Sequence, residues 1–140
     1  MPRRFFALLA LIILSVLLAA CARQPNSAQL APVSALPDMV KQAPASVRTA
    51  YQFALAHPDA LANVPCYCGC GSIGHHSNLA CYVKETNVDG KIVFDNHALG
   101  CSICVDIALD VMKMTEAGKP AGDIREQIVA TYSSFGPSNQ

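Results

Sequence analysis

Hydrophobic residues divide the chain into an apolar leader, a polar stretch and a longer segment with periodic patterning. Residues 5–18 are apolar throughout, and Arg3 and Arg4 precede them. A basic start followed by a short apolar run is typical of a secretory signal peptide. The run is shorter than the roughly 20 residues that a membrane-spanning helix needs, which makes a transmembrane anchor the weaker interpretation. We therefore expect residues 1–20 to be a signal peptide.

The end of this leader carries a second signal. Leu18, Ala19 and Ala20 lead directly into Cys21. Small residues before a cysteine are typical of a lipobox, in which the thiol is joined to a diacylglycerol bearing fatty acids such as palmitate and the leader is then cleaved. The sequence therefore predicts a lipid on Cys21 that anchors the protein to a membrane of the cell envelope, on its extracytoplasmic side.

The polar stretch follows immediately. Residues 22–43 contain Pro25, Pro32 and Pro37 among Ala, Ser, Gln and Asn. Such a composition favours an extended, flexible chain over a packed one. We expect a lipid-anchored flexible spacer over residues 21–43 and one folded domain over residues 44–140.

Three segments of the domain repeat their apolar residues at helical spacing. They cover about residues 44–57, 103–117 and 123–132. Pro58 and Gly118 stand where the first two patterns stop, as expected for residues that end helices. Three helices are therefore predicted, with one further turn after the first.

A hairpin is predicted between the first and second helices. Residues 81–84 and 91–94 have the composition of short strands, and Asp89-Gly90 supplies a turn signal between them. The tail, residues 133–140, has no pattern and is expected to fray. The fold class predicted is α+β: a small cysteine-rich domain with a cysteine knuckle, a short β-hairpin and about three helices.

The composition predicts that disulfides or a metal ion stabilise this domain. The chain has no tryptophan, and six cysteines remain besides Cys21. A small core of this kind usually needs disulfides or a metal for stability. Without Arg3 and Arg4, eight basic residues face ten acidic ones. The absence of a basic excess argues against a nucleic-acid partner.

The most informative segment is residues 65–81, which reads PCYCGCGSIGHHSNLAC. Its opening, Pro65 to Cys70, resembles the signature of the PCYCGC-motif protein family. The resemblance continues through Gly74-His75, Asn78 and Cys81 to residues 97–101 and Cys104, and it covers about residues 45–132. It implies an exported bacterial lipoprotein. It implies no activity and transfers no catalytic residue, because the family takes its name from the motif.

Closely spaced cysteines with intervening glycines can wrap a soft cation such as zinc or copper. A cysteine knuckle, a hairpin and a helix that opens with Cys-x-x-Cys also follow the order of a treble-clef zinc module. In that module, the knuckle and the start of the helix each give two ligands. We therefore expect a metal site formed by Cys68, Cys70, Cys101 and Cys104. Possible additional ligands are Cys66, Cys81, His75, His76 and His97.

Two other interpretations stay open. Exported proteins meet oxidising conditions, so six cysteines also fit a disulfide-stapled interaction module without metal. Cys101 and Cys104 at the start of a helix fit a thiol–disulfide redox protein less well, because no βαβ pattern precedes them. No nucleophile–base pair or acidic dyad stands out, and we do not expect an enzyme. The partners expected are the membrane, through Cys21, and an extracytoplasmic metal-handling protein.

Overall fold

The computed structural model describes residues 27–140, so the predicted signal peptide and the lipid site at Cys21 lie outside the described residues. The helices are α2 (Asp38–Lys41), α3 (Ala45–Ala56), α4 (Pro58–Ala62), α5 (Ser102–Glu116) and α6 (Ala121–Tyr132), and the strands are β1 (Val83–Thr86) and β2 (Ile92–Phe94). Among residues 27–140, no helix has the length and apolar content needed to cross a membrane. The predicted α+β class is confirmed.

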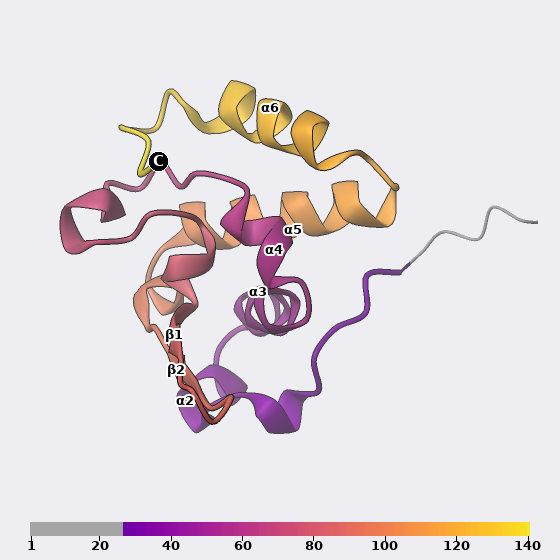
Figure 1. The fold of residues 1–140 in the computed structure, drawn as a ribbon, viewed down its shortest axis with the longest axis vertical. Helices are drawn as coiled ribbons and strands as arrows, with labels where there is room; N and C mark the ends of the chain where they lie inside the picture. Colours follow the sequence, from indigo (N-terminus) through magenta and orange to yellow (C-terminus); the bar gives the residue numbers. More distant parts are fainter. Residues whose placement is uncertain (1–26) are drawn as a thin grey trace, which may run out of the picture.

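The core lies between three helices. In Figure 1, α5 runs between α3 and α6, and α3 is seen nearly end-on. Tyr51 and Phe53 of α3 are fully buried, as is Ile107 of α5. On the other side of α5, α6 contributes the buried residues Ile124 and Ile128. Burial of one apolar stripe per helix explains why the helical periodicity in the sequence predicted these three elements correctly.

Prolines and one glycine set the helix ends. Pro44 and Pro120 occupy the N-cap positions of α3 and α6, and Pro58 is at the start of α4. Proline suits these places because a helix start has no intrahelical partner for its N–H groups. Gly118 follows α5 with φ +69°, in the left-handed region that glycine adopts at least cost. The predicted further turn after Pro58 is α4.

The predicted hairpin is also confirmed. β1 and β2 pair antiparallel, with Val83 opposite Phe94 and Thr86 opposite Ile92. The turn between them closes through a hydrogen bond from the Asn87 N–H to the Lys91 carbonyl oxygen, 2.9 Å long. The hairpin projects from the domain (Figure 1) and carries the chain from the cysteine-rich loop to the start of α5.

The structure differs from the expected spacer in the second half of residues 21–43. Residues Val33–Ala35 form a 3-10 turn, and α2 follows. Leu36 is 3% exposed and Val40 is fully buried, so this segment packs on the domain. Leu36 lies in extended backbone before α2 and Val40 lies within α2, and both side chains join the hydrophobic core. The many proline and polar residues of this segment favoured a flexible spacer, so the packing of Leu36 and Val40 on the domain was not predicted.

The tail was also predicted incorrectly. Residues 133–140 were expected to fray, but Asn139 is only 8% exposed and packs against the cysteine-rich loop. Its N–H donates to the Cys66 carbonyl oxygen at 3.2 Å. A Cβ atom at Gly136 would lie 2.7 Å from the Tyr67 carbonyl oxygen, so only glycine permits this close approach. Backbone pairing, which a hydrophobic pattern does not reveal, fixes the tail.

Candidate metal centre

The loop over residues 65–81 connects α4 to the hairpin and is folded by two glycines. Gly69 and Gly74 have φ +83° and +88°, and they flank a 3-10 turn over Cys70–Ile73. Residues with a Cβ rarely adopt this backbone conformation. The left-handed conformations of Gly69 and Gly74 turn the loop back on itself. As a result, the sulfur atoms of Cys70 and Cys81, eleven residues apart, lie 3.8 Å from each other.

One cysteine of α5 joins the loop cysteines. The Cys104 sulfur lies 3.4 Å from that of Cys66 and 3.6 Å from that of Cys68. The Cys66 and Cys68 sulfurs are 3.5 Å apart. All six cysteines within residues 27–140 are free thiols, because a disulfide requires about 2.05 Å. Thiolates arranged tetrahedrally around zinc at about 2.3 Å are about 3.8 Å from one another, so this spacing suits metal coordination.

These atoms form two four-ligand groups that could each hold a metal ion. In each group, all four ligand atoms lie within 4.8 Å of one another. The first group is Cys66, Cys68, Cys70 and Cys81, and the second is Cys68, Cys81, His97 and Cys104. We call these six residues the thiolate cluster.

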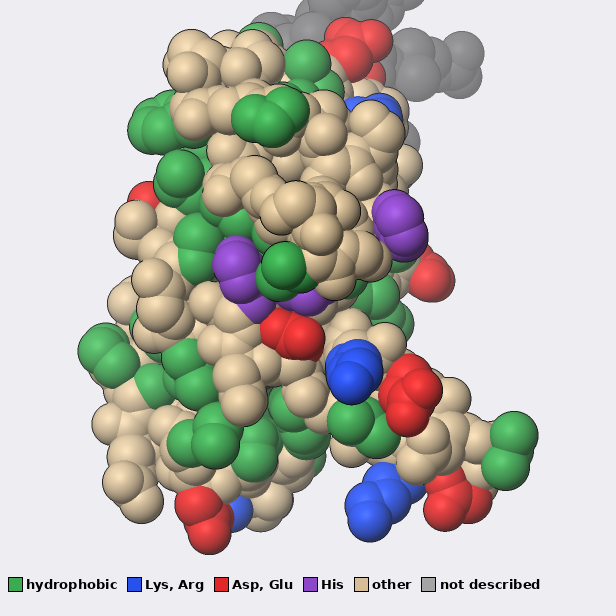
Figure 2. Space-filling model, turned by 90° about the vertical axis from the view of Figure 1, so that its left-hand side faces the viewer, with side chains coloured by type: hydrophobic (Ala, Val, Ile, Leu, Met, Phe, Trp, Pro, Cys, Tyr) green, Lys and Arg blue, Asp and Glu red, His purple; other side chains and the backbone are tan. Residues whose placement is uncertain are grey.

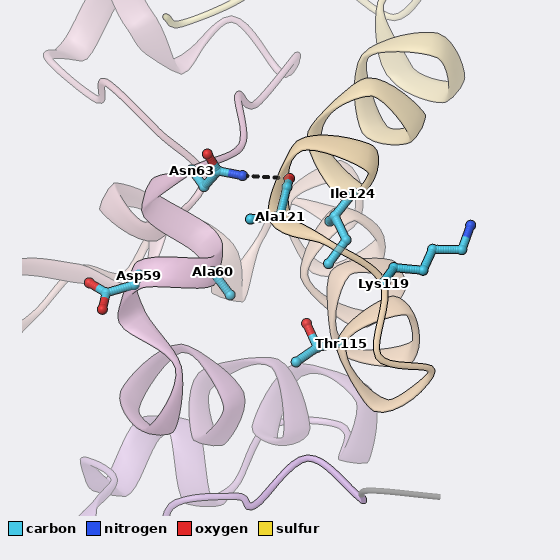
Figure 3. Close-up of a pocket in the computed structure, with 7 residues that line it drawn as sticks. All are labelled: Asp59, Ala60, Asn63, Thr115, Lys119, Ala121 and Ile124. Atoms are coloured by element: carbon cyan, nitrogen blue, oxygen red, sulfur yellow. Dashed lines mark hydrogen bonds between the residues drawn. The ribbon is translucent and has the colours of Figure 1, made fainter. Parts of the chain in front are cut away.

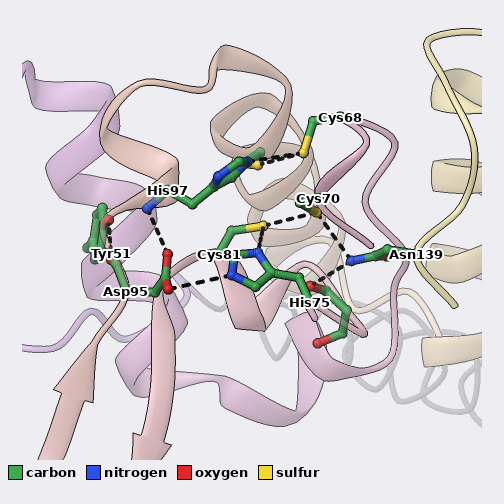
Figure 4. Close-up of polar contacts among 10 residues, drawn as sticks. Tyr51, Cys68, Cys70, His75, Cys81, Asp95, His97 and Asn139 are labelled. Carbon is green, nitrogen blue, oxygen red and sulfur yellow. Dashed lines mark hydrogen bonds and ion pairs between the residues drawn. The ribbon is translucent and has the colours of Figure 1, made fainter. Parts of the chain in front are cut away.

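The single histidine of the cluster comes from the segment between β2 and α5. His97 begins a 3-10 turn over His97–Leu99, and its Nε2 atom lies 3.3 Å from the Cys68 sulfur. Figure 4 shows this imidazole directed at Cys68. Cys66, Cys81 and Cys104 are fully buried, whereas Cys68 and His97 are partly exposed. The cluster therefore has a buried side and a side that solvent can reach.

Asp95 links the two histidines nearest to the sulfurs. One of its carboxylate oxygens accepts the His97 backbone N–H at 2.7 Å, and the other lies 3.5 Å from Nε2 of His75. His75 in turn places Nδ1 3.5 Å from the Cys81 sulfur (Figure 4). The hydroxyl of Tyr51 donates to the Asp95 carbonyl oxygen at 2.7 Å. Sequence reasoning missed Asp95, although it stands directly after a predicted strand and two residues before His97.

Amide and hydroxyl groups hold the backbone around the sulfurs. Asn78 and Tyr82 both donate to the Cys104 carbonyl oxygen, at 3.2 and 2.7 Å. The side-chain oxygen of Asn139 accepts the Cys66 N–H at 2.7 Å, and its amide nitrogen lies 3.5 Å from the Cys70 sulfur. Asn78 belongs to the quoted motif, but nothing in the sequence indicated a role for Asn139.

Proximity of the thiols changes their pKa values. Hydrogen bonds from Cys104 and Cys81 lower the pKa of Cys66 to about 2. The pKa of Cys104 is raised, because its proton is held by the hydrogen bond to Cys66. Burial raises the pKa of Cys68 and of Cys70. Because the pKa values of Cys68, Cys70 and Cys104 are raised, an incoming metal ion must displace protons from these thiols.

The structure does not bring Cys101 into the cluster. Of the four expected ligands, Cys68, Cys70 and Cys104 lie together, and Cys66 and Cys81 lie with them. Cys101 is the N-cap of α5, in extended backbone, and belongs to neither four-ligand group. It lines a separate cavity of about 310 Å³ beside α3. A treble-clef arrangement would take both cysteines from the helix start, whereas here the loop supplies the additional sulfurs.

The last of the candidate histidines, His76, has different surroundings. His76 is exposed and belongs to neither group. Figure 2 views the face that carries the cysteine-rich loop, and histidine side chains gather near its middle beside hydrophobic and acidic ones. Lysine and arginine side chains on this face are separate from one another (Figure 2). A soft-ligand site therefore opens on a face without a continuous basic patch.

A second hollow lacks soft metal ligands. It encloses about 270 Å³ between α4 and the turn that joins α5 to α6 (Figure 3). The lining residues are Asp59, Ala60, Asn63, Thr115, Lys119, Ala121 and Ile124. Two of these lining residues are joined by a hydrogen bond: the Asn63 side-chain amide donates to the Ala121 carbonyl oxygen at 2.9 Å. With neither cysteine nor histidine in its lining, it offers no soft ligand.

Comparisons with known proteins agree with the motif. A family model described as "protein of unknown function with PCYCGC motif" matches residues 10–138. No curated protein and no solved structure matches the chain. Because the family model spans nearly the whole sequence, the chain belongs to this PCYCGC-motif family.

Proposed function

We propose that the protein binds a soft metal ion, zinc or copper, through the thiolate cluster. The observation that carries this proposal is the gathering of five cysteine sulfurs and one imidazole nitrogen into two overlapping four-ligand groups. Thiolate and imidazole are the ligands that both metals prefer. No carboxylate belongs to either group, so hard cations such as calcium or magnesium are not suited to the site.

The ligand number favours binding over hydrolysis. Catalytic zinc sites usually supply three protein ligands and leave the fourth position to water, whereas closed sites supply four. Each group here supplies four. Metal handling, by sensing, delivery or sequestration, therefore fits the site better than hydrolytic catalysis does.

The location of this activity is part of the proposal. Arg3 and Arg4, the apolar run and Cys21 support export, cleavage and lipid anchoring. The anchored domain would then meet metal ions on the extracytoplasmic side of the cell envelope. Its partners there would be the membrane itself and a protein that supplies or receives the metal.

Metal content and thermal stability together test the proposal. The full chain is purified anaerobically from membranes in detergent, and its metal is measured with its native mass. We expect bound metal in the wild type and in Cys101→Ser, and its loss in Cys81→Ser, because Cys101 lies outside both groups. A chelator should lower the melting temperature, and reductant alone should not.

The disulfide alternative predicts the reverse pattern. Each disulfide lowers the mass by two hydrogens, and its reduction lowers the melting temperature whether or not a chelator is present. The proposal would be overturned in favour of a disulfide-stapled module if the protein contained no metal, had a mass lowered by two hydrogens per disulfide, and melted at a lower temperature after reduction.

A further inference from the structure

We propose that the thiolate cluster holds two metal ions bridged by the sulfurs of Cys68 and Cys81. This inference rests on the proposed function and specifies the number of ions and how their ligands are shared. Cys68 and Cys81 are the two residues common to both four-ligand groups. A thiolate sulfur has enough lone pairs to bind two metal ions, so a shared cysteine acts as a bridge.

The ligand count agrees with two ions. Two tetrahedral ions require eight metal–ligand bonds in all. Six donor residues supply eight bonds when two of them bridge. Cys66 and Cys70 would complete the first ion, and His97 and Cys104 the second. A single tetrahedral ion would instead leave two buried or partly buried donors of the cluster without metal.

Charge balance favours divalent over monovalent ions in the fully loaded cluster. Five thiolates carry five negative charges, and no hydrogen bond or ion pair within residues 27–140 joins a lysine or arginine side chain to a cluster atom. With all five sulfurs ionised, two divalent ions leave one formal negative charge in this largely buried site, whereas two monovalent copper ions leave three. Uncompensated buried charge is costly. Two divalent ions such as zinc therefore suit the cluster better than two monovalent copper ions.

The two ions would differ in accessibility. The first group is all sulfur, and three of its four residues are buried. The second group contains His97 and Cys68, both partly exposed and in direct contact at 3.3 Å (Figure 4). The second ion should therefore exchange more readily, which would make it the one that is passed to or received from a partner.

Cobalt(II) is the probe for this arrangement, because it takes the place of zinc and is paramagnetic. The reduced, metal-free full chain is titrated anaerobically in detergent, and bound cobalt is followed by its sulfur charge-transfer absorption and by electron paramagnetic resonance. We expect two cobalt ions per chain. The resonance signal should rise toward the first equivalent and fall toward the second, because bridging sulfur couples the two spins.

A matched pair of histidine variants identifies the second ion. His97→Ala should reduce the stoichiometry from two ions to one, and His76→Ala should keep two, since His76 belongs to neither group. The wild-type titration is decisive by itself, should His97→Ala fail to fold. One ion per chain, or two ions whose resonance signals simply add, would overturn the bridged pair. The proposed function of metal binding would remain supported in either case. No bound cobalt, zinc or copper at all would overturn the proposed function as well.

Discussion

At the residue scale, the candidate ligands are held in place by neighbours that belong to neither ligand group. Asp95 is the clearest case, because its carboxylate contacts the backbone of His97 and the ring of His75. Groups that orient metal ligands in this way commonly change metal affinity about 10–100-fold when they are removed. The arrangement of the histidines is therefore set by a residue that the cysteine motif does not include.

Asp95→Ala should weaken metal binding about 10–100-fold, because His97 and His75 lose the group that orients them. Competition with a chromophoric chelator measures the effect. Asp106→Ala is the matched control, since Asp106 is exposed on α5 and belongs to neither ligand group. Equal affinities in the two variants would contradict a positioning role for Asp95.

The thiols also predict how metal binding depends on pH. The pKa values of Cys68, Cys70 and Cys104 are raised, so these thiols keep their protons at neutral pH. A metal ion has to displace those protons, and its apparent affinity therefore falls as pH decreases. The ionisable groups that face them are Cys66, Cys81, His75, His97 and Asp95.

The expected decrease is steeper than about tenfold per pH unit, because more than one proton is displaced per ion. Zinc affinity measured by competition between pH 6 and pH 8 checks this, with proton release followed in weakly buffered solution. A constant affinity across that range would be inconsistent with thiolate ligands that are protonated in the metal-free protein.

At the scale of elements, the sequence predicted what regular patterns encode. The helical periodicity located α3, α5 and α6, and the Asp89-Gly90 signal located the hairpin. The contacts of Leu36 and Asn139 were missed, because each depends on a partner remote in sequence. The same limit applies to Cys101 and Cys104: spacing places both at a helix start, but only packing decides which one faces the loop.

The tail makes a prediction at this scale. Asn139→Ala removes the acceptor of the buried Cys66 N–H and the donor to the Ser77 carbonyl oxygen. The free energy of unfolding should fall by about 1–3 kcal/mol, the usual cost of leaving a buried polar group unpaired. Urea denaturation of metal-loaded protein measures it, with the exposed Ser134→Ala as control. A stability equal to that of the control would show that the tail does not support the loop.

At the scale of the whole molecule, we propose that a lipid on Cys21 holds the candidate metal centre at the cell envelope. The proposed anchor is Cys21, which lies outside the residues that the structure describes. Cys21→Ala should release the protein from the membrane fraction or leave an uncleaved precursor, as seen by fractionation and intact mass. Cys101→Ala is the matched cysteine control and should remain attached. A Cys21→Ala protein processed and retained like the wild type would contradict lipid anchoring.

The central claim is that cysteine sulfurs of the loop and of α5 bind the metal directly. X-ray absorption at the zinc or copper edge, on protein purified from membranes, tests it most directly because it identifies the ligand atoms. We expect the first coordination shell of the metal to consist mainly of sulfur, at about 2.3 Å for zinc, with a minor nitrogen contribution at about 2.0 Å. A shell of only nitrogen and oxygen atoms would contradict it.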